Sequence, residues 1–116
     1  MDITKLLEIQ KLLKPILKKT ENPFFKSKYA DLPDIIGAIR PILAGAGVYL
    51  SQTFSVSNGV VFCTTILTDG KDPIESTVPV ATVKDYTAQQ YGAIITYGRR
   101  YGIQTALCLE CDATLS

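Results

Sequence analysis

The first part of the chain has an apolar residue at every third or fourth position, which is the period of an amphipathic helix. The residues that follow this spacing are Leu6, Ile9, Leu13 and Ile16. They predict an N-terminal helix over residues 3–19, within the segment 1–20, with lysines mostly on its opposite face. Pro15 lacks a backbone N–H donor, so we expect it to kink this helix.

The helical spacing of apolar residues is interrupted at residues 21–29 and resumes after them. Residues 21–29 contain an Asn-Pro turn signal and are predicted to form a loop. A second helix is expected to begin at Asp31, a favourable N-cap residue, with Pro33 in its first turn. Gly45 and Gly47 are expected to end it. The apolar face of this helix consists of Leu32, Ile35, Ile36, Ile39 and Leu43.

The period changes to two after the second helix, which is typical of a strand with one buried face. This alternation covers Val48–Val56 and places Val48, Leu50, Gln52, Phe54 and Val56 on one side. Asn58-Gly59 follows, and both residues of a type I′ hairpin turn need a positive φ. Val60–Thr68 is rich in β-branched residues and is predicted to be the partner strand.

A third strand is predicted after the turn signal Asp69-Gly70. It covers Ile74–Val80 and completes a β-meander over residues 48–80. Pro79 has no N–H to donate to a neighbouring strand, so we expect this strand to lie at an edge of the sheet or to end there.

The last predicted element is a helix over residues 86–107. Thr87 and Gln90 fit a capping box, in which each side chain binds the backbone N–H of the other residue. The helix contains Gly92, Gly98 and Gly102, each of which costs about 1 kcal/mol relative to alanine. This cost indicates a close approach to the helix backbone. Packing on the sheet is the favoured explanation, and a ligand strand or a neighbouring subunit is the alternative.

The order of elements is α-α-β-β-β-α. It predicts an α+β fold in which a three-stranded antiparallel meander is followed by a long helix, with helices on one face of the sheet. A length of 116 residues suits a single domain, which we assign to residues 1–116, with the loop and second helix in segment 21–47.

The amino-acid composition excludes several classes of function. The net charge is only +1, but the charge is uneven, with eight basic and five acidic residues in residues 1–47 and four and six in residues 48–116. The absence of histidine excludes histidine-based triads and most zinc enzymes. The single Gly-Lys pair, Gly70-Lys71, is not part of a phosphate-binding P-loop. Asp31 and Asp34 suit a helix start better than a catalytic acid pair.

The chain is expected to be cytoplasmic. Its longest apolar stretch, Ile42–Leu50, is nine residues, against about 20 needed to span a membrane. Charged residues interrupt the N-terminus, so no signal peptide is predicted. The odd number of cysteines does not suit a disulfide scaffold. Cys108 and Cys111 have C-x-x-C spacing, but a zinc site would need further ligands such as Cys63 or carboxylates, and free thiols are favoured.

Two segments combine cations with aromatic rings. Residues 22–29 interleave two lysines with three aromatic residues, and residues 96–101 place two arginines between two tyrosines. Cations neutralise phosphates and aromatic rings stack on unpaired bases, so both segments suit single-stranded nucleic acid. On the last helix a polar face is expected, and Arg99 points about 100° away from it. The residues of this face are Gln89, Ala93, Thr96, Arg100 and Gln104. The alternative is that the arginines form local ion pairs and that Phe24 and Phe25 fill the core.

These same segments resemble a known family. Asn-Pro-Phe-Phe-Lys-Ser-Lys-Tyr-Ala-Asp-Leu at residues 22–32, followed by an isoleucine-rich helix into Arg40-Pro41, is similar to the opening motif of the ERF (essential recombination function) single-strand annealing proteins of bacteriophages. Gln-Tyr-Gly-Ala-Ile-Ile-Thr-Tyr-Gly-Arg-Arg-Tyr at residues 90–101 is similar to the second motif of that family. The resemblance covers residues 5–108.

The resemblance implies a recombinase-type protein that binds single-stranded DNA and anneals complementary strands without ATP or another cofactor. It also implies a β-β-β-α core shared with annealing proteins that form rings or filaments. The implied partners are single-stranded DNA, further copies of the chain in a homo-oligomer, and a single-strand binding protein; the implied location is the cytoplasm of a bacterial host. Many relatives have an acidic run after the second motif, where this chain has only Glu110 and Asp112.

The candidate DNA-binding residues come from both segments and from the last helix. They are Lys26, Lys28, Tyr29, Lys84, Gln89, Thr96, Tyr97, Arg99, Arg100 and Tyr101. No catalytic or metal-binding residue is expected, because annealing makes and breaks no covalent bond. The alternative function is a regulatory module that binds another protein through a sheet edge or the glycine-rich helix. A small enzyme has little support in the sequence.

Overall fold

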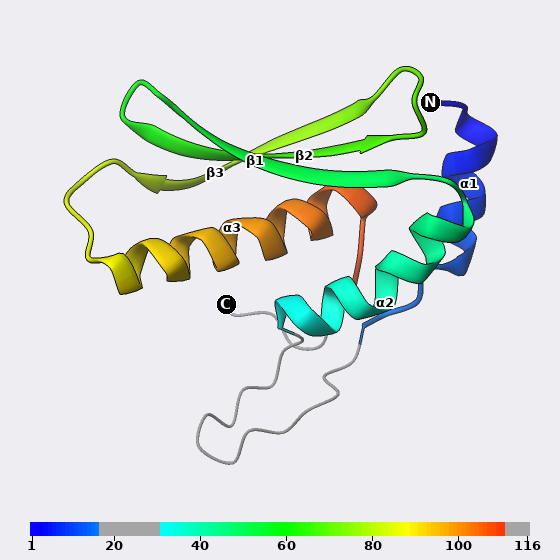
Figure 1. The fold of residues 1–116 in the computed structure, drawn as a ribbon, viewed down its shortest axis with the longest axis horizontal. Helices are drawn as coiled ribbons and strands as arrows, with labels where there is room; N and C mark the ends of the chain where they lie inside the picture. The colour runs from blue at the N-terminus through cyan, green and yellow to red at the C-terminus, as the bar shows by residue number, and fades with distance from the viewer. Residues whose placement is uncertain (17–30, 111–116) are drawn as a thin grey trace, which may run out of the picture.

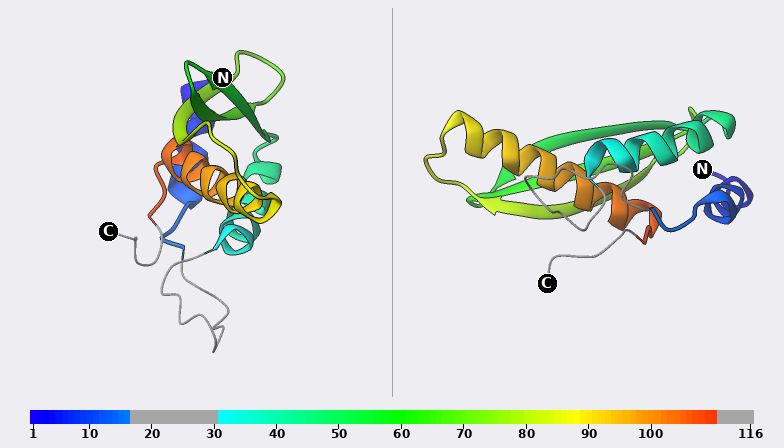
Figure 2. Two further views of the ribbon diagram at one scale, coloured as in Figure 1. Left: turned by 90° about the vertical axis from the view of Figure 1, so that its left-hand side faces the viewer. Right: turned by 90° about the horizontal axis from the view of Figure 1, so that it is seen from below.

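The structure is a computed structural model that describes residues 1–16 and 31–110. Two helices are followed by a three-stranded antiparallel sheet and a long C-terminal helix, so the predicted α+β fold is confirmed. Helices α2 and α3 lie on one face of the sheet and α1 lies at one end of it (Figures 1 and 2). No helix in the described ranges is long and apolar enough to cross a membrane.

Helix α1 spans Ile3–Leu12 and is shorter than predicted. The apolar period continues to Ile16, but residues 13–16 are not helical. The prediction of a kinked helix to residue 19 is therefore wrong at its C-terminal end. The reason is Pro15, because a proline disfavours the α conformation of the residue before it. Pro15 ends the helix instead of kinking it, and Ile16 is buried with its N–H donating to the carbonyl of Glu110 at 2.8 Å.

Helix α2 spans Leu32–Gly45 and begins as the sequence predicts. The side chain of Asp31 accepts from the backbone N–H of Asp34, and the Asp34 carboxylate accepts from the N–H of Asp31. These two bonds satisfy N–H groups that no helical carbonyl can reach. The pair is thus structural, as its position at the helix start indicated. Gly47 follows the helix at φ 71°, a backbone conformation that suits glycine.

The sheet has the order β1-β2-β3, with β1 at Tyr49–Ser57, β2 at Val60–Thr68 and β3 at Ile74–Thr82. Asn58 and Gly59 have φ values of 49° and 73°, as the predicted hairpin turn requires. The third strand is two residues longer than expected. Pro79 lies on this edge strand, where its missing N–H is tolerated.

A register shift in β3 brings the sheet close to the last helix. Val61 pairs with Ala81 and Phe62 with Pro79, which leaves Val80 as an extra residue. Such a bulge changes the direction in which a side chain points. Val80 lies under α3, where a Cβ on Gly98 would meet its Cγ1 at 2.9 Å.

Helix α3 spans Ala88–Leu107 and starts with the predicted capping box of Thr87 and Gln90. Gly98 and Gly102 are buried against the sheet, so the packing explanation is confirmed for both. Gly92 has no atom within 4 Å of the position a Cβ would take, and close packing does not explain it.

The hydrophobic core lies at one end of the sheet, where all three helices meet. Its buried members are Ile9, Ile16, Leu32, Ile35, Ile39, Leu43, Val48, Leu67, Ile103 and Leu107. The N-terminal half of α3 contributes none of these residues. It extends away from the core along β3 (Figure 1), and its outward side is therefore available for binding.

Candidate nucleic-acid interface

The face of α3 that points away from the sheet carries the polar residues predicted for it. Gly98 and Gly102 mark the sheet side. The residues of the polar face are exposed in the first half of the helix and half-buried in the second: Gln89, Ala93, Thr96, Arg100 and Gln104. Of these, Gln89 and Thr96 are predicted site residues, and both are accessible to a ligand.

Three predicted site residues lie together on α3, where Tyr101 contacts both of the others, and we call them the Tyr-Arg cluster: Tyr97, Arg100 and Tyr101. The rings of Tyr97 and Tyr101 are 4.5 Å apart between centroids and tilted by 53°. The guanidinium carbon of Arg100 is 5.0 Å from the centroid of the Tyr101 ring, a distance suited to a cation–π interaction. The spacing of four residues between the tyrosines places them one above the other on a helix. Tyr97 remains 48% exposed.

Arg99 lies on a different side of α3 from Arg100, as the angle between successive helical residues requires. Its Nε donates to Oε1 of Gln52 on β1 at 3.3 Å. The Gln52 amide nitrogen donates to the backbone carbonyl of Arg99 at 2.9 Å and to Oγ1 of Thr65 at 3.0 Å. The amide of Gln52 therefore fixes both the backbone and the side chain of Arg99 relative to the sheet.

The position of Arg99 has an electrostatic consequence in the sheet. Burial raises the pKa of the Cys63 thiol above its usual value, and the positive charge of Arg99 opposes this rise. Cys63 is fully buried on β2 and is a free thiol. It therefore stays neutral at physiological pH and leaves the charge of Arg99 uncompensated by a thiolate.

Lys84 lies apart from the Tyr-Arg cluster, in the segment before α3. Its ammonium nitrogen is 5.3 Å from the centroid of the Tyr86 ring. Tyr86 packs edge-on against Tyr91 with centroids 5.4 Å apart. The rise of an α-helix separates Tyr91, the nearest member of this group, from Tyr97 by about 9 Å along the axis. The structure thus forms two cation and tyrosine groups along α3 and does not bring Lys84 into contact with the arginines.

The open face of the sheet offers little to a polyanion. Strand alternation places Tyr49, Ser51, Thr53 and Ser55 of β1 on it, opposite Thr68, Ile66, Thr64 and Phe62 of β2. Glu75 of β3, which pairs with Ile66, is the single charged residue of the three strands. Nucleic acid would therefore meet positive charge on the helical side of the sheet.

The sequence interpretation missed three residues. Gln52 was expected only as a member of the buried strand face, and a polar residue on such a face is itself a signal of a specific partner. Tyr86 and Tyr91 flank the start of α3 and extend its row of aromatic residues. Lys26, Lys28 and Tyr29 lie outside the described residues and stay predictions.

Within residues 1–16 and 31–110, no group of three His, Cys, Asp or Glu residues is placed so that it could bind a metal ion. Cys108, at the end of α3, is an exposed free thiol. Cys111, the other half of the C-x-x-C pair, lies outside the described residues.

Comparison with known proteins gives one finding. A family model described as ERF superfamily matches residues 3–114, which is nearly the whole chain. No curated protein and no solved structure matches the chain.

Proposed function

Because this chain belongs to the ERF superfamily, we propose that it binds single-stranded DNA and anneals complementary strands during phage recombination, without a nucleotide cofactor. The observation that carries the proposal is the family match over residues 3–114. The Tyr-Arg cluster on α3 supports it, because it lies within the second motif by which the sequence resembles the family.

In the proposed mechanism, the tyrosine rings and the arginine cations contact different parts of the DNA. Tyr97 and Tyr101 support unpaired bases by stacking, and Arg100 neutralises phosphates beside them. Stacking uses the flat faces of the bases and leaves their Watson–Crick edges free. A second strand can then pair with the exposed edges, and no bond has to be made or broken. The protein therefore acts as a binding template and not as an enzyme.

Arg99 contributes from the other side of α3. Its Nε is held by Gln52, while the guanidinium also carries two terminal nitrogens that can donate to a phosphate. Since Gln52 fixes its orientation, Arg99 loses little side-chain freedom when DNA binds. We assign it a phosphate-positioning role distinct from that of Arg100.

Self-association extends the proposal to long DNA. A net charge of +1 gives one chain little long-range attraction for DNA. Several copies arranged in a ring or filament would align their α3 surfaces into one continuous track. The proposed setting is the cytoplasm of a bacterial host, where a single-strand binding protein is a further candidate partner.

Fluorescence anisotropy with a labelled oligonucleotide tests this function. We expect tighter binding to single-stranded than to double-stranded DNA, and binding that weakens as salt is raised. Arg100→Ala and Arg99→Ala should each lower the salt slope, log affinity against log salt, by about 0.7, the value for one phosphate contact. Lys11→Ala, an exposed substitution on α1, is the matched control and should leave the slope unchanged. Equal affinity for both DNA forms would contradict the proposal.

A further inference from the structure

Strand β1 is an edge of the sheet, and within residues 1–16 and 31–110 its outward side has no backbone partner. The residues that flank a two-residue hairpin turn exchange both backbone bonds, and here they are Ser57 and Val60. The backbone groups of every second residue of β1 therefore point away from β2. These outward residues are Leu50, Gln52, Phe54 and Val56. Such a row of N–H and C=O groups can pair with another extended strand.

The two edges of the sheet differ in how they resist such pairing. Proteins usually protect an edge strand with charged residues, a proline or a bulge. Edge strand β3 has all three, in Glu75, Pro79 and the extra residue Val80. Strand β1 has none of them, because its nine residues are uncharged, include no proline and pair with β2 without a shift in register. The edge of β1 is therefore the one suited to another chain.

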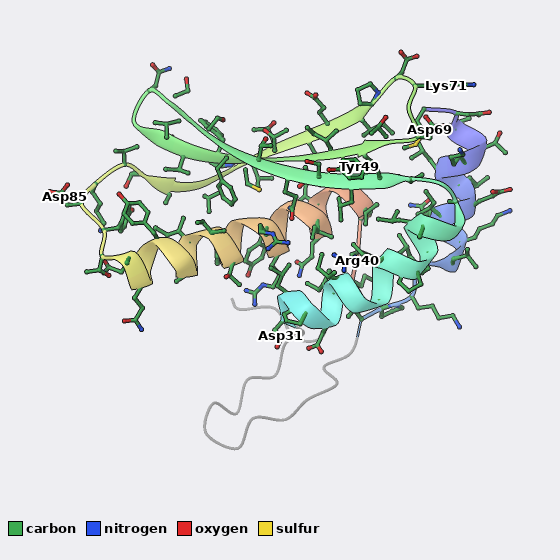
Figure 3. The ribbon with its side chains drawn as sticks, viewed as in Figure 1. Asp31, Arg40, Tyr49, Asp69, Lys71 and Asp85 are labelled. Carbon is green, nitrogen blue, oxygen red and sulfur yellow. The ribbon has the colours of Figure 1, made fainter. Side chains whose placement is uncertain are left out.

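The inner face of β1 is covered at its start and open at its end. Helix α2 packs under the start of the strand, where Figure 3 labels Arg40 and Tyr49, whereas α3 packs mainly on β2 and β3. Val56, near the end of β1, is 64% exposed although the alternation places it on the helical side. A mostly apolar hollow of about 260 Å³ lies between α2 and the start of β1, with Ile36 and Leu50 in its wall. One end of β1 thus has an exposed apolar side chain and the other end an apolar hollow.

We propose that two copies of the chain pair antiparallel through the free edges of β1, about a two-fold axis at Thr53. This register places Leu50 opposite Val56 of the partner subunit. Gln52 then lies opposite Phe54 of the partner subunit. In each of these pairs both residues have outward backbone groups, so they can exchange two hydrogen bonds.

The same register matches the side chains of the two copies. Val56 of each copy meets the apolar hollow between α2 and Leu50 of the other. On the open face of the sheet, Ser51 lies opposite Ser55 of the partner subunit, and the two Thr53 residues lie opposite each other. Because β1 carries no charge, no like charges face each other across the pair. A second copy of the chain is therefore the partner that this edge fits.

The pairing also affects the proposed DNA surface. A two-fold axis between antiparallel neighbours is perpendicular to the sheet, so both copies carry their helices on one side of a continuous sheet. Gln52 is next to the axis and holds Arg99, so the two Arg99 residues come near each other on that side. The inference rests on the proposed function and deepens it, because it names the surface through which copies associate. A ring or filament would be built from such pairs through a second contact.

Sedimentation velocity at several protein concentrations, without DNA, tests the pairing. We expect the wild type to form a dimer. Val56→Lys places an ammonium group in the apolar hollow beside Arg40 of the partner subunit. The dissociation constant of the dimer should rise by about 100-fold or more, a factor of about ten at each of the two equivalent sites. Val83→Lys is the matched control, because Val83 is 53% exposed and follows β3, away from the edge of β1, and should leave the constant unchanged.

A cross-link at the axis tests the register. In Thr53→Cys the two new thiols face each other in a non-hydrogen-bonded pair, whose Cα atoms lie about 4.5 Å apart, within the range of a disulfide. Oxidation should therefore link the two chains. Ser55→Cys is the control, because the two equivalent positions lie about 13 Å apart along the strands and should not be linked. In both variants Cys108 and Cys111 are replaced by serine, so that their thiols cannot form the link.

The outcomes separate this inference from the proposed function. A wild type that stays monomeric, as it would if the edge served a peptide of another protein, overturns the inference. So does a Val56→Lys protein that associates like the wild type, or a cross-link formed equally by Ser55→Cys. Thermal unfolding midpoints equal to that of the wild type show that each variant is folded. If the wild type binds single-stranded DNA in any of these cases, the proposed function stands, whereas a dimer that binds no DNA contradicts the proposed function alone.

Discussion

Gln52 shows how a single polar residue can join two elements. Its amide donates to the Arg99 carbonyl and to Thr65, and it accepts from the Arg99 side chain. This arrangement needs a close approach of helix and sheet, which Gly102 permits. The strand alternation correctly predicted that Gln52 faces inward. Its partner could not be predicted, because the contact joins residues 47 positions apart in the chain.

Substitutions of two glycines on α3 test this packing at the residue scale. A Cβ on residue 102 would lie 2.7 Å from Oγ1 of Thr65 and 3.1 Å from the amide nitrogen of Gln52. Gly102→Ala should therefore destabilise the fold by about 1–3 kcal/mol, the usual cost of overpacking. Gly92→Ala is the control, since no atom lies within 4 Å of its Cβ position. It should stabilise the helix by about 0.5–1 kcal/mol.

The free energy of unfolding in urea measures both effects. A Gly102→Ala protein as stable as the wild type would contradict the packing of α3 on Thr65 and Gln52. The expected contrast, destabilisation by Gly102→Ala and stabilisation by Gly92→Ala, would then be absent.

At the scale of elements, the features that depend on local sequence could be predicted. The caps at Asp31 and Thr87 and the turn at Asn58-Gly59 each depend on residues at most three apart. The end of α1 was mispredicted, because the apolar residue Ile16 keeps the helical period although Pro15 excludes the helix. Ile16 is buried through a non-local contact with Glu110, which no helical period describes.

The ion pair between Lys5 of α1 and Asp69 of the turn after β2 is expected to make stability depend on pH. Asp69, in the turn after β2, has a pKa below its usual value, first because the backbone N–H of Lys71 donates to its carboxylate and next because the Lys5 ammonium does. A carboxyl group with a lowered pKa in the folded state adds stability above its unfolded pKa, near 3.8. That stability is lost as pH falls through the lower folded value.

Asp69→Asn should therefore be less stable than the wild type at pH 7, and the difference should shrink below about pH 3.8. Unfolding in urea at pH 7 and at pH 3 measures it. Lys5→Met is a second variant that removes the ammonium and should cause part of the same loss. A difference between wild type and Asp69→Asn that is unchanged between the two pH values would show that the charge of Asp69 contributes nothing.

At the scale of the whole molecule, the positions of the arginines on the surface depend on how the helices pack and not on their order in the sequence. Arg99 and Arg100 are adjacent in the chain, but one is held against β1 and the other joins the tyrosines of α3. Arg40 lies on α2, which is on the same side of the sheet as α3 (Figure 1). The composition showed that the chain has cations in both halves, yet only the packing of α2 and α3 on one face determines which of them share a surface.

The candidate site could be predicted in part. The spacing of Tyr97, Arg100 and Tyr101 on one helix places them near one another, and in the structure Tyr101 contacts both Tyr97 and Arg100. The open face of the sheet, with Glu75 as its one charged residue, offers no cation to a polyanion.

The most direct measurement is the annealing rate of two complementary oligonucleotides, followed by fluorescence quenching in the absence of any nucleotide cofactor. At protein concentrations that saturate binding, we expect annealing faster than spontaneous pairing, and a smaller acceleration by an Arg99→Ala, Arg100→Ala double variant than by Lys11→Ala. An unchanged rate at saturation would contradict the annealing function and would leave a protein that binds single-stranded DNA without promoting its pairing.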